Sequence, residues 1–79
     1  MAKGTQDVRY RRLIEALAVA RRKARINQTD LAEQLGKRQQ FVSKYESGER
    51  RLDAVELFDI ASALGLNLTA LFEEITGSK

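Results

Sequence analysis

The chain has 79 residues, of which 43% are hydrophobic, which is enough for one domain with a modest core and argues against disorder of its body. It contains no cysteine and no histidine, so disulfides, thiolate metal sites and histidine-based catalysis are excluded, and the lack of cysteine fits a reducing cytoplasm. The formal net charge is +3, and no apolar run approaches the roughly 18 residues of a membrane span.

Apolar residues recur at helical spacing along the chain, without a strand pattern, an internal repeat or a proline. This spacing predicts an all-α fold of five short helices. The first helix is expected from about Asp7 to Arg25, on a stripe of apolar side chains: Leu13, Leu17, Ala20 and Ala24.

The next two helices are marked by caps and glycines. The second is predicted to begin after the N-cap Asn27 and to stop at Gly36. The third is predicted from about Gln39 to Glu46, with its end near Gly48.

The last two helices carry similar signals. Asp53 is the expected cap of the fourth helix, with Glu56 as its capping-box partner, and Gly65 ends it. Asn67 caps the fifth, whose apolar face contains Leu68, Leu71, Phe72 and Ile75. Residues 1–6 and 77–79 are expected to form terminal tails, which leaves residues 7–76 as one domain.

The third helix carries an uncommon polar face. At about 100° per residue, Phe41, Val42 and Tyr45 fall on one apolar arc that should pack inward. The rest of the surface holds four hydrogen-bonding side chains, of which one is charged: Gln39, Gln40, Ser43 and Lys44. A glutamine amide matches the N6 donor and N7 acceptor of adenine, so this face suits the DNA major groove. A merely solvated helix face is the other interpretation of the same residues.

Cations flank this face at both ends. Lys37 and Arg38 stand at the N-terminal end of the helix, where the dipole disfavours positive charge, and Arg38 occupies the expected N-cap position. An external phosphate would compensate for both features. Arg50 and Arg51 form a second cluster just past the third helix. We therefore expect all four side chains to bind DNA phosphates.

The charge is also unevenly distributed along the chain. Residues 1–51 contain 13 of the 14 Lys and Arg residues but six of the 11 acidic residues, whereas residues 52–79 contain one Lys and five acids. The basic part is expected to meet a polyanion while the acidic part has another role. Charge on its own is equally compatible with chance placement on solvated helix faces.

The stretch "INQTDLAEQLGKRQQFVSKYESGERRLDAVELFDIASALGLNLTALF", residues 26–72, resembles the helix-turn-helix domain of the phage lambda and 434 repressor and Cro family, also called the xenobiotic-response-element family. The resemblance rests on several features in one register: Gln28, "LA" at Leu31–Ala32, Gly36, the Val42 and Tyr45 pair, "E-x-G" at Glu46–Gly48, and "ALG" at Ala63–Gly65.

The resemblance implies a five-helix lambda-repressor-like fold in which helices 2 and 3 form the helix-turn-helix and helix 3 enters the major groove. Carried over by position, the base-facing residues would be Gln39, Gln40, Ser43 and Lys44. Gln28 would bind phosphate and brace the recognition helix. In related proteins the residues that match Arg21 and Glu46 form a largely buried ion pair, so we expect Glu46 to be structural. Family members generally bind partly palindromic operators as twofold dimers.

The chain departs from the family pattern at three places. Arg38 replaces the usual capping Ser, and Arg51-Leu52 replaces the usual Asn-Pro. Phe41 occupies a position that is often small and polar. The Phe41 ring either completes the core or reaches toward a thymine methyl group.

The acidic C-terminal part is the expected surface for self-association. It is rich in apolar side chains for a short last helix, and the expected dimer interface contains Leu66, Leu68, Leu71, Phe72 and Ile75. The other explanation is that these side chains complete the core of the monomer.

Taken together, the sequence predicts a cytoplasmic, bacterial or phage-type transcriptional regulator that binds double-stranded DNA as a homodimer. We expect no cofactor, metal, membrane contact or small-molecule ligand. An enzyme is disfavoured because His and Cys are absent and no glycine-rich phosphate loop is present. An antitoxin-like protein-binding module that also autoregulates through DNA remains the alternative. Binding to RNA or single-stranded DNA is disfavoured because exposed aromatic residues are scarce.

Overall fold

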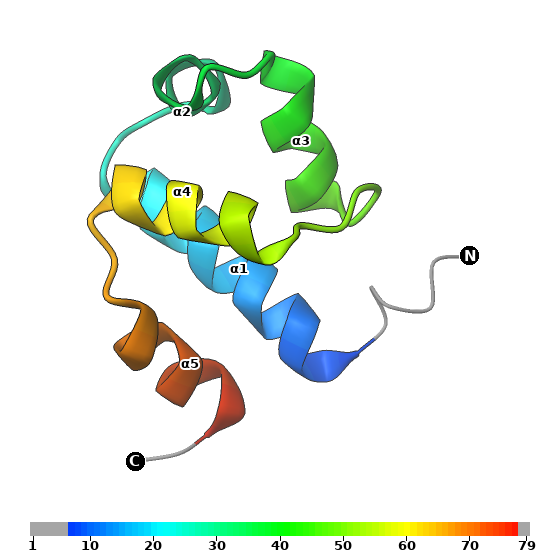
Figure 1. Cartoon of the computed structure of the whole chain (residues 1–79), viewed down its shortest axis with the longest axis vertical. Helices are drawn as coiled ribbons and strands as arrows, with labels where there is room; N and C mark the ends of the chain where they lie inside the picture. The colour runs from blue at the N-terminus through cyan, green and yellow to red at the C-terminus, as the bar shows by residue number, and fades with distance from the viewer. Residues whose placement is uncertain (1–6, 78–79) are drawn as a thin grey trace.

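The computed structural model describes residues 7–77, and in this range it contains five α-helices and no strand (Figure 1). The helices are α1 (Val8–Lys23), α2 (Gln28–Leu35), α3 (Gln39–Ser47), α4 (Ala54–Leu64) and α5 (Leu68–Thr76). The predicted all-α class is therefore confirmed, with α2 and α3 as the helix-turn-helix pair. The C-terminal tail was predicted to begin at residue 77, but Gly77 is the C-cap of α5. The rest of the predicted tails, residues 1–6 and 78–79, lies outside the described residues.

Helices α2, α4 and α5 begin at the predicted side-chain caps. The side-chain oxygens of Asn27, Asp53 and Asn67 each accept a hydrogen bond from the backbone N–H three residues later, at 2.7–2.9 Å. At Asp53 the contact is reciprocal, because the Glu56 carboxylate accepts from the Asp53 backbone N–H at 3.0 Å. These bonds satisfy N–H groups that a helix leaves unpaired in its first turn. Helix α3 lacks such a bond, because the Arg38 side chain caps nothing.

The first helix ends two residues earlier than predicted. α1 stops at Lys23, Ala24 is its C-cap, and Arg25 adopts a left-handed conformation with φ of 61°. The backbone N–H groups of residues 25 and 26 then donate to carbonyls in the last turn of α1, which is a Schellman ending. Gly36 gives α2 the same left-handed ending, with φ of 69°, and a glycine adopts it without strain.

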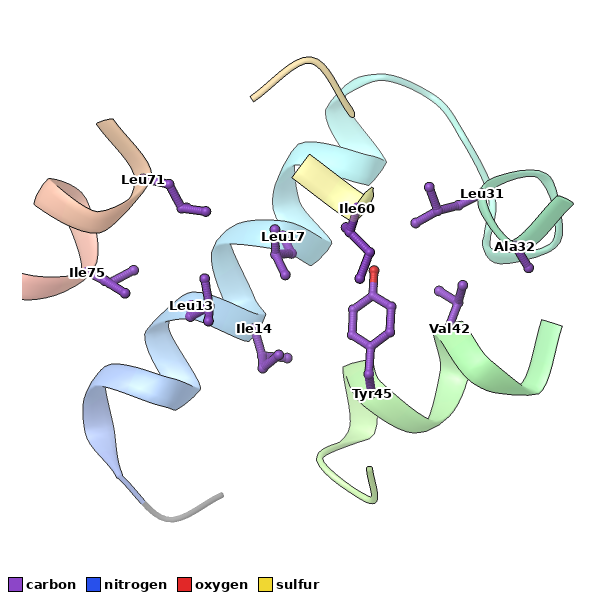
Figure 2. Packing of buried hydrophobic residues seen from close by; sticks show 10 residues of the cluster. All are labelled: Leu13, Ile14, Leu17, Leu31, Ala32, Val42, Tyr45, Ile60, Leu71 and Ile75. Carbon is purple, nitrogen blue, oxygen red and sulfur yellow. The ribbon is translucent and has the colours of Figure 1, made fainter. Parts of the chain in front are cut away.

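The core lies where α1 meets the other helices, and Figure 2 shows its side chains pointing toward one another. Its largest fully buried side chains come from four helices: Leu17, Leu31, Val42, Tyr45 and Ile60. Because α2 and α3 share this core with α1, the helix-turn-helix is anchored as one unit and its outer surface remains available.

The predicted apolar stripe of α1 is only partly correct. Ile14 and Ala18 face the core, whereas Ala20 is half-buried and Ala24 is exposed. Ala24 lies beyond the last turn of the helix. The buried residues of α1 follow two neighbouring rows of side chains spaced four residues apart, one beginning at Leu13 and the other at Ile14. Ala20 belongs to neither row and lies at the edge of the buried surface.

Helix α5 packs on α1 on the other side from α2 and α3 (Figure 1). Leu71 and Ile75 are buried, and Figure 2 shows them facing Leu13 and Leu17. The Arg12 guanidinium also donates to the Ile75 carbonyl at 3.4 Å. The last helix therefore belongs to the monomer core.

Candidate nucleic-acid interface

One face of α3 is polar and accessible to solvent. The opposite side of the helix is buried through Val42 and Tyr45. The accessible face carries the four predicted base-facing side chains, three of them exposed and the last half-buried: Gln39, Gln40, Lys44 and Ser43. The residues that the sequence singled out therefore share one continuous helix surface.

The two glutamines on this face differ in their hydrogen bonds. The Gln39 Nε2 donates to the Gln28 Oε1 at 2.9 Å, so Gln39 is held from α2. The Gln40 side-chain amide has no partner within residues 7–77, and only its backbone carbonyl is used, by the Ser43 hydroxyl at 3.2 Å. Gln40 therefore keeps its full set of side-chain donors and acceptors available to a ligand.

A chain of polar contacts connects Gln39 to α1. The Gln28 Nε2 donates to Glu46 Oε1 at 2.9 Å, and Glu46 accepts two bonds from Arg21, at 2.7 and 3.1 Å. The side chains of Arg21 and Glu46 are each 10% exposed, and hydrogen bonding to Glu46 raises the pKa of Arg21. Arg21 also donates to the Ile26 carbonyl at 2.8 Å. The orientation of Gln39 thus depends on an ion pair that links α1 to α3.

Two exposed cations, Lys37 and Arg38, precede α3. The Arg38 backbone is extended, with φ of −81° and ψ of 155°, and its side chain makes no capping bond. Within residues 7–77, the first N–H groups of α3 therefore have no side-chain acceptor, and the first turn contains no acidic residue to offset the positive end of the helix dipole. An anion at this position would meet both free N–H groups and positive charge.

The structure separates the two loop arginines that the sequence grouped together. Arg50 donates to both carboxylate oxygens of Glu56, at 2.8 and 2.7 Å. These bonds, together with the bond from the Asp53 backbone N–H, lower the pKa of Glu56 from 4.5 to about 2. Its guanidinium carbon also lies 5.0 Å from the centroid of the Phe41 ring. Arg51 instead lies over the Tyr10 ring at 4.3 Å and forms no ion pair with the described residues. Of the two, Arg51 keeps an uncompensated charge.

The structure favours the first of the two alternatives for Phe41, in which its ring completes the core. Its side chain is half-buried, packs against the core and contacts the Tyr45 ring edge-on at a centroid distance of 5.5 Å. The Lys37 ammonium lies 5.3 Å from the Phe41 centroid. Together with the Arg50 contact, this places cations against the ring, a favourable arrangement for an aromatic face.

Two residues of this region were missed by the sequence interpretation. Tyr10 contacts the loop between α3 and α4, and its only signal was an aromatic side chain among arginines near the start of the chain. Glu56 was recognised as a capping-box residue but not as the partner of Arg50. Neither contact has a local sequence signature, because both depend on how the loop folds.

The surface predicted for self-association is largely used within the monomer. Four of its five residues are buried or half-buried against the core: Leu66, Leu68, Leu71 and Ile75. Phe72 remains 44% exposed. Two further large apolar side chains on α4 are exposed, Val55 at 68% and Phe58 at 57%. The structure thus supports the monomer-core explanation for most of the set, and dimerisation stays a prediction.

Residues 7–77 contain no group of three or more His, Cys, Asp or Glu side chains that could hold a metal ion. No single described helix is long and apolar enough to cross a membrane, and α4 and α5 reach that length only as a pair bent by 110°.

Comparison with known proteins agrees with the geometry of α2 and α3. A helix-turn-helix family model matches residues 17–71. Among solved structures, an XRE-family like protein from Pseudomonas syringae pv. tomato str. DC3000 is similar, with a TM-score of 0.85 and 40% sequence identity. The match covers 95% of this chain and 92% of that chain. No curated protein sequence gives a significant match.

Proposed function

The chain belongs to the helix-turn-helix family of the xenobiotic-response-element type, a family of DNA-binding transcription regulators, and we propose that it recognises a specific double-stranded DNA sequence. In this proposal α3 lies in the major groove and its accessible face contacts base edges. The protein regulates transcription by occupying an operator. We further propose that it acts in the cytoplasm of a bacterium or of a phage-infected cell.

The observation that carries the proposal is the side-chain amide of Gln40, which lies on the accessible face of α3 and has no partner within residues 7–77. An amide with a free donor and a free acceptor in one plane can form two hydrogen bonds with adenine in the major groove. Gln28 orients the Gln39 side chain through a hydrogen bond. In this proposal Gln39 reads a neighbouring base. Ser43 and Lys44 complete the reading face with one hydroxyl and one ammonium group.

Phosphate contacts are assigned to the groups that flank this face. Lys37 and Arg38 precede the first N–H groups of α3, which the Arg38 side chain does not cap. Gln28 begins α2, and its side chain is bonded to Gln39 and Glu46. Arg51, whose guanidinium lies over the Tyr10 ring and pairs with no acidic residue within residues 7–77, provides a cation at the other end. Arg50 contributes less than its sequence position suggests, because Glu56 compensates its charge.

We also propose that the chain binds its operator as a homodimer. The exposed apolar side chains of Val55, Phe58 and Phe72 lie on α4 and α5, in the part of the chain that carries one Lys and five acids. Acidic side chains disfavour contact with DNA, so this part is free to meet a second copy. Sedimentation over a range of concentrations should show dimer formation, and a monomer at every concentration, with and without operator, would contradict it.

The proposed function is tested by selection from a random double-stranded library with the purified chain at near-physiological salt. The expected result is an enriched, partly palindromic sequence with half-sites about ten base pairs apart. Salt-sensitive retention of DNA without an enriched sequence would contradict sequence-specific recognition, because phosphate contacts alone produce that behaviour.

A further inference from the structure

Tyr10 connects the start of α1 to the loop between α3 and α4. Its hydroxyl oxygen accepts a hydrogen bond from the backbone N–H of Leu52 at 3.0 Å, although 42 positions separate the two residues. Both side chains are half-buried and pack against the core. The chain contains no proline, so the rigidity of this loop depends on such contacts. Tyr10 therefore fixes the loop backbone at a point two residues before α4.

The ring of Tyr10 also holds the side chain of Arg51. The guanidinium carbon lies 4.3 Å from the ring centroid, which is a close cation–π contact. A guanidinium held over a ring face keeps the hydrogen-bond donors in its own plane available. No described acidic residue pairs with Arg51. The side chain thus combines a fixed position, a free charge and free donors, which suits a phosphate group.

The neighbouring Arg50 is arranged for a different role. Both of its terminal nitrogens bind the Glu56 carboxylate, and its Nη1 also donates to the Arg51 carbonyl at 3.1 Å. The α3–α4 loop is therefore attached at two points: to Glu56 on α4 through Arg50, and to Tyr10 on α1 through Leu52. Between these two attachments, the Arg51 side chain is the cation that remains available.

We propose that Tyr10 is a positioning residue that fixes the α3–α4 loop and aims Arg51 at a DNA phosphate beside the groove occupied by α3. The inference rests on the proposed function, because Arg51 needs DNA as its ligand. Tyr10 itself makes no contact with DNA in this arrangement. Its contribution reaches the phosphate through the Leu52 backbone and through the orientation of the Arg51 side chain.

The test is a double-mutant cycle between Tyr10 and Arg51, read by DNA affinity at several salt concentrations. Arg51→Ala is expected to weaken binding to the selected operator and to random DNA alike, and to reduce the salt slope by about 0.9, the value for one phosphate. Tyr10→Leu removes the hydroxyl and the ring, and is expected to weaken binding about three- to tenfold. In the Arg51→Ala background, the same Tyr10 change should have little further effect.

Two conservative variants separate positioning from folding. Tyr10→Phe keeps the ring and removes the hydroxyl, so the Leu52 amide should exchange faster with solvent while affinity falls about two- to fivefold. Tyr45→Phe is the matched control, because Tyr45 is the only other tyrosine and its hydroxyl has no partner within residues 7–77. It should leave both affinity and salt slope unchanged. Thermal melting of each variant ensures that binding is measured on folded protein.

Each outcome decides the inference. An equal loss from Tyr10→Leu with and without Arg51 would overturn it, since Tyr10 would then act through general stability. An unchanged affinity and salt slope in Tyr10→Leu would overturn it as well. Failure of the wild type to bind any double-stranded DNA would overturn the proposed function and this inference together. Wild-type binding with additive Tyr10 and Arg51 effects would overturn only the inference.

Discussion

Removal of the Glu46 carboxylate is expected to destabilise the domain severely. The Arg21 side chain is only 10% exposed, and Glu46→Ala would leave it as a cation with the Ile26 carbonyl at 2.8 Å as its remaining bond among the described residues. Gln28 would lose its acceptor at the same time. A buried charge that loses its partner costs about 3–5 kcal/mol of folding free energy. A domain of this size has a total stability of about 4–12 kcal/mol, so the variant should be close to unfolding.

The assay is urea denaturation followed by circular dichroism. With a urea dependence of about 1 kcal/mol per molar for a small domain, the midpoint of Glu46→Ala should fall by about 3 M or more. Glu49→Ala is the matched control, because Glu49 is exposed and should change stability by less than about 0.5 kcal/mol. The double variant Arg21→Met, Glu46→Leu removes both charges and should be more stable than Glu46→Ala.

The reasoning would be refuted if the free energy of unfolding of Glu46→Ala lay within about 1 kcal/mol of the wild-type value. A buried guanidinium without its partner should destabilise the fold by more than that. It would also be refuted if the double variant were no more stable than Glu46→Ala. Either result would mean that Arg21 reaches solvent when its partner is absent, and that the pair does not hold α1 against α3.

Three further changes test other parts of the fold. Tyr45→Phe removes a buried hydroxyl without a partner among residues 7–77, so thermal melting should show equal stability or a gain of about 1 kcal/mol, and a clear loss would mean that the hydroxyl is satisfied. Arg25→Gly relieves a left-handed conformation and should raise the free energy of unfolding in urea by about 0.5–1 kcal/mol, whereas a decrease would argue against that conformation. Bonding to Arg50 and to the Asp53 backbone N–H lowers the pKa of Glu56 to about 2, so the stabilisation from the ionised Glu56 carboxylate is fully present above pH 4.5 and is lost as the pH falls toward 2. Glu56→Gln should therefore reduce the acid sensitivity of stability, followed by circular dichroism from pH 6 to pH 2, and an unchanged acid transition would contradict the pairing.

The helices could be predicted because their signals are local. Asn27, Asp53 and Asn67 bond to N–H groups only three residues away, and Gly36 and Gly65 adopt the left-handed conformation that ends a helix. Such contacts depend on short stretches of chain, so spacing and residue type are sufficient to recognise them. The polar face of α3 was predictable for the same reason, since helical periodicity alone places its residues.

The contacts of the α3–α4 loop could not be predicted, because they join distant segments. Nothing in the residues around Tyr10 indicates a bond to Leu52. The choice of Arg50 between a carboxylate and a phosphate depends on where the loop places it relative to Glu56. The end of α1 was misplaced because Arg25 adopts a conformation that its residue type disfavours.

The sequence also did not determine which surface covers the apolar face of α5. An apolar stripe shows that one helix face is covered but does not identify the covering surface. The structure shows that α5 packs on α1 with Leu71 and Ile75 buried, while Phe72 stays 44% exposed. An interface between two copies and an interface between two helices of one copy have the same sequence pattern, and packing distinguishes them.

The central claim is that α3 reads bases, and the affinity of Gln40→Ala on two duplexes tests it most directly. Gln34→Ala serves as the control, because Gln34 is an exposed glutamine on α2, outside the α3 face. Gln40→Ala should bind the selected operator about 5- to 150-fold more weakly than the wild type and bind random DNA nearly as well. Gln34→Ala should match the wild type on both duplexes. Equal losses for Gln40→Ala on operator and random DNA would contradict base reading by α3.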